Sequence, residues 1–271
     1  MKPLSIAALL TAGVGLVTAT TSPSSNVLDD IIARGYLRVG TTGDYAPFTH
    51  VTKLTNSTTG TDLIGADIDM AESLSSALGL TSPPIFVKTV WANLATNIST
   101  GAFDIGMGGI SITLARALKA FFSTPVLRVG KVACVPCSRV SEFSSLAAID
   151  RAGIKVATPA GGSNEAFDRA NFQTAEIVVY PVNSDIFRAL LNETADVVVT
   201  DRVEAELWAG LYPDVLCAVH AETPYSFEEL GYIMPRDVVW QNFVNEWLRI
   251  QQGSGAWNST MAAWMKYDWG L

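Results

Sequence analysis

The sequence predicts an α/β protein whose two lobes enclose a small ligand between them. Strand-like apolar runs alternate with helical patterns of about ten residues along most of the chain. The series restarts near Lys131, and it contains too many units for one sheet. No tract rich in Pro, Gly or Ser separates the halves, which indicates strands that pass directly between the lobes as hinges. We therefore expect two parallel sheets, each covered by helices on both faces.

Length and composition indicate a globular protein and exclude some partners. The 271 residues are 49% hydrophobic and 16% charged, which suffices for one large core or two modest ones. The net charge of -8 and the absence of a Lys/Arg run argue against a nucleic-acid partner. An anionic ligand would therefore need a local positive site. The sequence does not fix the number of subunits and is compatible with a homo-oligomer.

Residues 1–19 have the pattern of a secretory signal peptide. Lys2 precedes an apolar run from Leu4 to Val17, and small residues stand at Val17 and Ala19, where a signal peptidase cleaves. A membrane anchor is the alternative, but the run is shorter than the roughly 18 to 20 apolar residues that a span needs. No later segment is long enough to cross a membrane, so we predict a secreted protein with no membrane partner once the signal is removed. Sequons that fit a glycoprotein of the eukaryotic secretory route begin at Asn56, Asn97, Asn192 and Asn258.

Three cysteines also bear on the compartment. In an oxidising environment two of them should form a disulfide, and we favour Cys137 with Cys217, which leaves Cys134 over. A zinc site is the weaker alternative, because Cys134 and Cys137 form a lone pair and the only histidines are His50 and His220. We expect no metal site.

The predicted elements begin with a short helix and a buried strand. Leu28, Ile31 and Ile32 form an apolar stripe of helical spacing that stops at Gly35, and Tyr36–Gly40 follows as a strand. Further strands are expected at Ile85–Val90, Phe103–Met107, Lys131–Val135, Ile154–Ala157, Ile177–Tyr180, Asp196–Thr200 and Gly231–Met234. Helices are expected at Ala66–Leu78, Ala92–Thr100, Thr113–Lys119, Asn164–Asn171, Ser184–Leu191, Asp201–Ala209, Val238–Gln251 and Ala256–Met265.

These elements divide into two lobes. The last two helices need a surface to pack on, and a return to the first lobe is the economical choice, which makes that lobe discontinuous. We assign residues 26–128 and 229–271 to lobe 1 and residues 129–228 to lobe 2. The polar stretch Val51–Asp62 is expected to be an exposed hairpin tip without a chemical role.

Polar residues follow the predicted strands, which is where open parallel sheets bind ligands. Helix N-termini at that edge direct free N–H groups toward the ligand. The run from Gly109 to Arg116 follows the third strand and places Arg116 about one turn inside a helix. Because a guanidinium binds a carboxylate through two parallel hydrogen bonds, Arg116, with Ser111 and Gly109, is a candidate to hold one. An ordinary solvated arginine is the alternative, and Lys119 and Lys131 are weaker candidates that we predict to be surface charges.

A second polar turn opens the predicted helix of the other lobe. Gly161 and Gly162 would let a ligand approach the backbone closely, and Ser163 and Asn164 follow directly. The turn lacks the Gly-Lys-Ser/Thr ending of a Walker motif. Ser163 could instead be only an N-cap.

Two carboxylates stand three residues apart where another helix begins. Asp201 and Glu204 can therefore point the same way. A neighbouring negative charge and burial raise the pKa of a carboxyl, whereas a helix N-terminus lowers it. If the raising effects dominate, one of the pair could donate a proton near neutral pH. The alternative is a charged first turn that complements the helix dipole. Trp91 directly follows a strand and could form an apolar wall of the ligand site.

Several stretches together resemble the polar amino-acid solute-binding proteins, which have the type 2 periplasmic-binding fold. They are Leu37–Phe48, Gly65–Met70, Gly101–Asp104 and Ser111–Thr113 with Arg116. The resemblance covers nearly the whole mature chain. It implies two lobes joined by two hinge strands and a ligand cleft between them, with Arg116 on a ligand carboxylate and Asp201 where those proteins bind an amino group.

A narrower set of stretches resembles the cyclohexadienyl dehydratases, which convert prephenate to phenylpyruvate and arogenate to phenylalanine. They are Thr41–Tyr45, Trp91–Leu94, Gly161–Phe167, Thr200–Ala205 and Leu216–His220. The resemblance implies a lyase that needs no cofactor, with Glu204 as the general acid and Trp91 against the ring. It further implies hydrogen bonds from Asp44, Asn164 and Asp201 around the leaving hydroxyl and polar tail, and carboxylate binding by Arg116, Ser111 and Ser163. A secreted binding protein for an amino acid or a related carboxylate is the alternative function.

Overall fold

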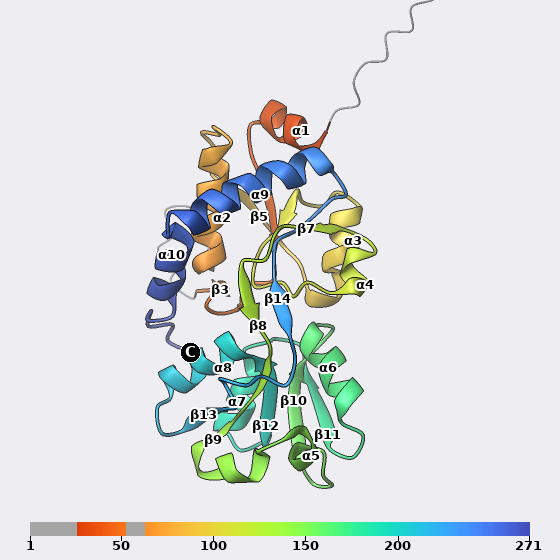
Figure 1. The fold of residues 1–271 in the computed structure, drawn as a ribbon, viewed down its shortest axis with the longest axis vertical. Coiled ribbons are helices and arrows are strands. Elements are labelled where there is room, and N and C mark those ends of the chain that lie inside the picture. Colours follow the sequence, from red (N-terminus) through yellow and green to blue (C-terminus); the bar gives the residue numbers. More distant parts are fainter. Residues whose placement is uncertain (1–25, 53–62) are drawn as a thin grey trace, which may run out of the picture.

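Two five-stranded sheets, one in each lobe, organise the chain (Figure 1). The computed structural model describes residues 26–52 and 63–271, so the expected signal peptide and the sequon at Asn56 lie outside the described residues. The strands are β1 (Arg38–Thr41), β2 (Asp44–Tyr45), β3 (Thr49–Val51), β4 (Leu63–Ile64), β5 (Ile85–Lys88), β6 (Ile105–Gly106), β7 (Phe121–Phe122), β8 (Leu127–Val129), β9 (Lys131–Pro136), β10 (Lys155–Pro159), β11 (Glu176–Tyr180), β12 (Val197–Asp201), β13 (Leu216–Val219), β14 (Glu228–Leu230) and β15 (Ile233–Met234).

Every helix expected from the sequence is present with ends that differ by a few residues. They are α1 (Val27–Arg34), α2 (Ala66–Ala77), α3 (Leu94–Ser99) after the 3-10 turn η1 (Trp91–Asn93), α4 (Leu114–Ala117), α6 (Ser163–Asn171), α7 (Asp185–Leu191), α8 (Arg202–Leu211), α9 (Val238–Gly253) and α10 (Ala256–Trp264). The structure adds a 3-10 segment η2 (Cys137–Phe143) and α5 (Leu146–Ile149). Both ends of α1 are capped by residues suited to that place. The Asn26 side chain accepts the Asp29 N–H at the start, and Gly35 ends the helix in the left-handed conformation at φ 81°.

The sheets are mixed, so the expectation of parallel sheets was only partly right. In the order β5-β1-β6-β15-β7, strands β5, β1 and β6 are parallel and β15 is antiparallel to both neighbours. In the order β11-β10-β12-β9-β13, strand β9 is the antiparallel one. β9 and β15 directly follow the strands that cross between the lobes. They therefore enter their sheets without the crossover helix that a parallel neighbour needs.

Strands β8 and β14 connect the lobes and pair with each other in antiparallel fashion (Figure 1). Each continues into a sheet strand, β8 into β9 and β14 into β15. Two hydrogen-bonded crossings permit rotation of one lobe against the other while opposing their separation. We propose to place the lobe boundaries inside these strands, at residues 128/129 and 228/229.

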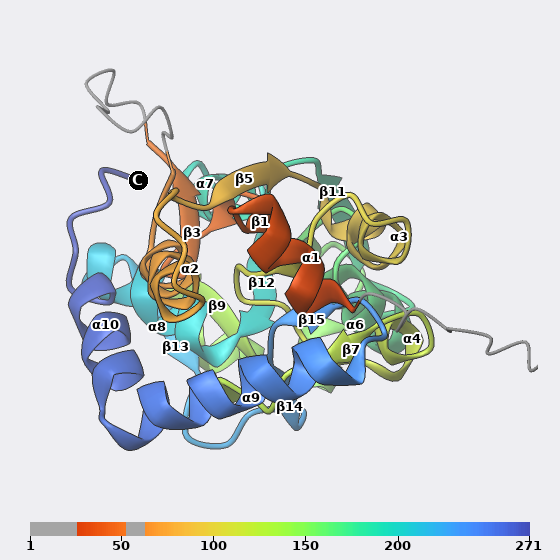
Figure 2. The same cartoon turned by 90° about the horizontal axis from the view of Figure 1, so that it is seen from above.

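The C-terminal helices pack against the elements that begin the chain. In the view of Figure 2, α2 and α3 lie on either side of β1, and α9 runs across the same lobe to α10. Trp240, Trp247 and Trp257 of these helices are buried in the core of lobe 1. No helix within residues 26–52 and 63–271 is long and apolar enough to cross a membrane.

Two local features bear on the sequence predictions. β3 pairs with β4 on either side of the stretch Val51–Asp62, but residues 53–62, which would form the hairpin tip, lie outside the described residues. The disulfide between Cys137 and Cys217 is formed and Cys134 is a buried free thiol, which confirms the predicted pairing.

Candidate functional site

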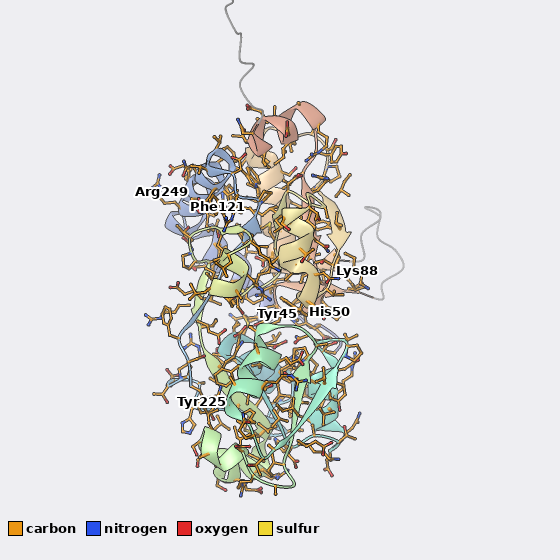
Figure 3. The ribbon with its side chains drawn as sticks, turned by 90° about the vertical axis from the view of Figure 1, so that its right-hand side faces the viewer. Tyr45, His50, Lys88, Phe121, Tyr225 and Arg249 are labelled. Carbon is orange, nitrogen blue, oxygen red and sulfur yellow. A yellow bond between two sulfur atoms is a disulfide. The ribbon has the colours of Figure 1, made fainter. Side chains whose placement is uncertain are left out.

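The carboxyl ends of the sheet strands of both lobes face each other across a closed cleft. A cavity of about 20 Å³ lies at its centre, which is room for about one water molecule. Both lobes line it, with the residues Tyr45, Trp91, Gly109, Ser111, Pro159, Gly162, Ser163, Asn164, Asn183 and Asp201. Figure 3 shows Tyr45 and His50 at the junction of the two lobes.

Several polar contacts join the lobes across this cleft. The Ser111 and Ser163 hydroxyls lie 2.8 Å apart. The Tyr45 hydroxyl donates to the Asp201 carboxylate at 2.6 Å. Asp44 accepts the backbone N–H of Asn183 at 3.0 Å. The residues that the sequence placed after strands of different lobes are therefore in contact, and the structure is that of the closed form.

Lys131 lies at the centre of the site, so the prediction that it is a surface charge was wrong. Its side chain is fully buried. The ammonium donates to Ser163 at 3.2 Å and to Asp201 at 2.7 Å, and it lies 3.3 Å from Glu228. It also donates to the Asn164 side-chain oxygen at 2.5 Å. Burial lowers the pKa of Lys131, but Asp201 and Glu228 raise it more, so the amine is charged. Lys119, the other lysine considered, is exposed as predicted.

Asp201 is held by partners from both lobes. One carboxylate oxygen accepts from Tyr45 and the other from Lys131. It stands at the N-cap of α8, yet its side chain makes no capping hydrogen bond. The internal ammonium of Lys131 thus occupies the position on Asp201 where the resemblance would place a ligand amino group.

Glu204 is a buried carboxyl whose acid form is stabilised. Only 1% of the residue is exposed, and burial raises its pKa to about 8. Asp201 and Asp44 also contribute to this rise in the pKa, whereas hydrogen bonds from Thr200 and Asn183 oppose it. Of the influences weighed from the sequence, burial is the largest. A protonated carboxyl at neutral pH is the state that a general acid requires.

The raised pKa of Glu204 predicts a pH-dependent difference in stability between the wild type and Glu204→Gln. Between about pH 4.5, the ordinary pKa of glutamate, and about pH 8, the folded chain holds a proton that the unfolded chain has released. This carboxyl therefore makes the free energy of unfolding fall as pH rises through that window. The glutamine variant lacks this effect. The melting temperature of the variant minus that of the wild type should therefore increase as pH rises from about 4.5 to about 8.

Thermal melts of both proteins across that pH range would test this expectation. Asp67 and Asp168, whose pKa values burial raises to about 6 and 7, are present in both proteins and cancel in the comparison. Identical pH profiles for the two melting temperatures would contradict the assignment of a raised pKa to Glu204.

Arg116 enters the cleft from lobe 1 on the side of the hinge strand β14. One of its N–H groups donates to the Ser111 carbonyl at 2.8 Å, and the others have no hydrogen-bond partner among the described residues. Burial lowers the pKa of the guanidinium, while Asp201 and Glu228 raise it. It lines a cavity of about 410 Å³ with Ser163 and Glu228. Arg116 is therefore half-buried with free donors, and the alternative of an ordinary solvated arginine does not describe it.

A chain of hydrogen bonds leads from Arg116 to Glu204 through both lobes. The first links run from Arg116 to Ser111, from Ser111 to Ser163, and from Ser163 to Lys131. Lys131 then donates to Asn164, and the Asn164 amide donates to Thr200 at 2.9 Å. Thr200 in turn contacts Glu204 at 2.5 Å. Arg116 and Glu204 thus belong to one connected polar network in the cleft.

The remaining predicted residues line the same space with differing roles. Trp91 lies edge-on to Tyr45, with ring centroids 5.8 Å apart. It borders the central cavity, the cavity of about 410 Å³ beside Arg116, and a further cavity of about 540 Å³. Gly109 lines the central cavity, but its N–H points away from it and donates to Asp67 at 2.9 Å. Its φ is +69° and an added Cβ would lie 2.5 Å from the Phe48 ring, so glycine is required there. Gly162 is also at the cavity, with its Cβ position 3.8 Å from Trp91.

A larger cavity of about 540 Å³ adjoins the centre on the side of the edge strands β5 and β11. Asp44, His50, Lys88 and Trp91 line it from lobe 1, and Gly161 and Val182 from lobe 2. It forms the mouth of the cleft, on the side away from the strands that lead into the hinges.

Sequence reasoning did not single out four residues of the network, Tyr45, Lys131, Asn183 and Thr200, as site residues. Asn183 carried a usable signal, since it is a polar residue just after the predicted strand Ile177–Tyr180. Lys131 carried one as well, because a lysine that begins an otherwise apolar strand needs a buried partner. No group of three or more metal-ligating side chains was found among the residues that the structure describes.

Comparison with known proteins assigns the chain to a family. Residues 37–267 match the bacterial extracellular solute-binding proteins, family 3. The chain is 40% identical to a cyclohexadienyl dehydratase of Pseudomonas aeruginosa over 254 residues, which cover 94% of this chain and 91% of the relative. An ancestral amino acid-binding protein described as a precursor of cyclohexadienyl dehydratase superposes with a TM-score of 0.79 at 31% identity, covering 88% of this chain and 99% of that one. An ancestral cyclohexadienyl dehydratase superposes with a TM-score of 0.56 at 38% identity, covering 91% and 99%. This chain belongs to family 3 of the bacterial extracellular solute-binding proteins and has their two-lobed fold.

Proposed function

We propose that this protein is a secreted lyase that converts prephenate to phenylpyruvate, arogenate to phenylalanine, or both. The observation that carries the proposal is Glu204, a buried carboxyl that lies directly behind Asn183 of the cavity lining and has its pKa raised to about 8. The 40% identity to a cyclohexadienyl dehydratase supports it, because the match spans 94% of the chain. A protein that only binds an amino acid has no need of a protonated carboxyl at this place.

The proposed reaction needs one proton donor and firm positioning. Glu204 protonates the ring hydroxyl, the C–O bond breaks and water leaves. The bond to the ring carboxylate breaks as carbon dioxide departs, and its electron pair completes the aromatic ring. Glu204 ends as a carboxylate and regains its proton from solvent. General acid catalysis contributes typically about 100- to 10,000-fold, so orientation in the closed cleft supplies the rest.

The other residues of the cleft are assigned roles by their chemistry. Arg116 has free guanidinium donors and would hold a substrate carboxylate, with the hydroxyls of Ser111 and Ser163 beside it. Trp91 would pack against the ring. Asn164, Asp201 and Asp44 would form hydrogen bonds to the polar groups of the substrate. No cofactor enters this scheme.

Lys131 would supply the charge that this arrangement needs. Its ammonium neutralises Asp201 and lies beside Ser163, where a substrate carboxylate would otherwise meet the negative charge of Asp201. Because Asp201 is already paired with Lys131, it is not available to bind the α-amino group of a substrate. The cleft is therefore better suited to a substrate that has no α-amino group. We therefore propose that prephenate is preferred to arogenate.

Incubation of the purified protein with prephenate tests the proposal. Phenylpyruvate should form, as followed by its absorbance, faster than in the acid-catalysed background reaction at the same pH. With arogenate the same assay would follow phenylalanine, and we expect the lower kcat/KM there. Absence of product above background from both substrates would reject the proposed lyase.

Amino-acid binding without chemistry is the second candidate, and one observation favours it. The ancestral protein that superposes with a TM-score of 0.79 is described as amino acid-binding. This candidate predicts that common amino acids raise the melting temperature, and that at equal concentration those that bind more tightly raise it more. The pairing of Asp201 with Lys131 at 2.7 Å argues against it, because the carboxylate would have to exchange partners.

We also propose that the protein is exported and glycosylated. The family is extracellular by description, and two of the sequon asparagines, Asn192 and Asn258, are exposed. Asn97 is half-buried and donates to Thr89 at 2.9 Å, which makes it the poorest acceptor of the three described.

A further inference from the structure

Asn183 links the candidate acid of lobe 2 to a residue of lobe 1. It lies in the turn between β11 and α7 and is 3% exposed. Its side-chain amide donates to Glu204 Oε1 at 2.5 Å and to the Asp44 main-chain carbonyl at 3.3 Å. Its backbone N–H donates to Asp44 Oδ2 at 3.0 Å. Asn183 therefore contacts Asp44 twice while it holds one oxygen of Glu204.

The orientation of this amide is fixed by its neighbours. The Asp44 main-chain carbonyl can only accept a hydrogen bond, so the amino group of Asn183 must face it, and the same group then faces Glu204. Because an amide N–H only donates, Glu204 Oε1 must accept. The other oxygen, Oε2, accepts from the Thr200 hydroxyl.

The two hydrogen-bond partners of the Glu204 carboxyl differ in how they are held. Thr200 stands four residues before Glu204 at the end of β12, so its contact is internal to lobe 2 and is independent of lobe closure. Asn183 is in a turn, and two of its polar contacts reach across to Asp44. These two contacts can exist only when the lobes are together.

We propose that Asn183 is a positioning residue that couples closure of the lobes to the orientation of the Glu204 carboxyl. When Asp44 of lobe 1 meets Asn183, the amide is turned onto Oε1 and holds the carboxyl in one orientation. When the lobes part, the turn loses both contacts with Asp44, and Thr200 alone continues to hold the carboxyl by a contact that does not depend on closure. This inference rests on the proposed function, in which Glu204 is the acid, and adds that the acid is set for catalysis only in the closed form.

The variant Asn183→Ala removes the amide but keeps the backbone N–H that bonds Asp44. We expect kcat for prephenate to fall about 10- to 100-fold, since a hydrogen bond to an ionisable group is lost, while KM changes little. The alkaline limb of the kcat profile should move to higher pH, because the lost donor had favoured the ionised carboxyl. Asn192→Ala, at an exposed asparagine of the same lobe, should change neither quantity.

A double-mutant cycle with Asp44→Ala tests the coupling to closure. If Asp44 acts on the acid through Asn183, the effects of the two substitutions on kcat should be strongly non-additive. Additive effects, or an alkaline limb that Asn183→Ala leaves in place, would overturn the proposal. A merely structural role of Asn183 would lower the yield of folded protein without moving the pH profile.

A second readout keeps the inference separate from the proposed function. If neither substrate is turned over, the pKa of Glu204 can still be followed as the pH-dependent difference in melting temperature from the corresponding Glu204→Gln variant. That difference should extend to higher pH in the Asn183→Ala background. Other titratable groups that interact with Glu204 are Asp201, Asp44, Tyr45 and Cys134, and they are common to both backgrounds. An unchanged pH window would overturn the positioning role whether or not the protein is a lyase.

Discussion

Replacing Glu204 by glutamine is expected to lower kcat for prephenate by about 100- to 10,000-fold. Glutamine keeps the size of the side chain and can accept the hydrogen bond from Asn183, but it has no proton to give. KM should change much less, because Arg116, Ser111 and Ser163 are untouched. Steady-state kinetics of phenylpyruvate formation near neutral pH would measure both quantities.

Glu206→Gln is the matched control for this substitution. Glu206 lies on the same helix, is half-buried, and has a pKa that burial also raises, but it faces Arg202 rather than the cleft. Its replacement should leave kcat unchanged. Equal losses in kcat and in substrate affinity for Glu204→Gln, or full activity, would contradict its role as the acid.

Replacing Lys131 by methionine is expected to destabilise the fold by about 3 to 5 kcal/mol. Methionine preserves the length and apolar stem of the side chain but removes the ammonium. Asp201 and Glu228, which lie 2.7 Å and 3.3 Å from that ammonium, would then be left close together without the cation that pairs with both. Chemical denaturation at neutral pH would give the loss in the free energy of unfolding.

Two further variants make the Lys131 prediction specific. Lys119→Met removes an exposed lysine and should be nearly neutral for stability. Adding Asp201→Asn to Lys131→Met removes a carboxylate along with its partner and should restore a large part of the loss. If Lys131→Met were as stable as the wild type, the buried ion pair would not be a determinant of the fold.

The positions of most site residues could be predicted because strand ends are readable in the sequence. Ser111, Ser163, Asn164 and Asp201 each follow or end an apolar strand, and parallel strands bring such ends to one edge of a sheet. The structure does place these residues at one cleft. Their specific roles came from a family resemblance, since a polar residue at a strand end is compatible with several chemistries.

Lys131 shows what the sequence could not provide. Its burial depends on the place of β9 between β12 and β13, and on carboxylates that come from positions 201 and 228. A lysine at the start of an apolar strand indicates a buried partner, but which carboxylates serve as that partner is set by tertiary packing and leaves no local pattern. The antiparallel direction of β9 and β15 escaped prediction for a similar reason, because it follows from how the chain crosses between lobes rather than from hydrophobic periodicity.

The small volume at the centre of the cleft has a kinetic consequence. A space of about 20 Å³ admits about one water molecule, whereas any aromatic acid is many times larger. Substrate binding and product release therefore both require an opened form, and kcat cannot exceed the rate at which the lobes open. The strands β8 and β14, about which the lobes rotate, would then limit the rate.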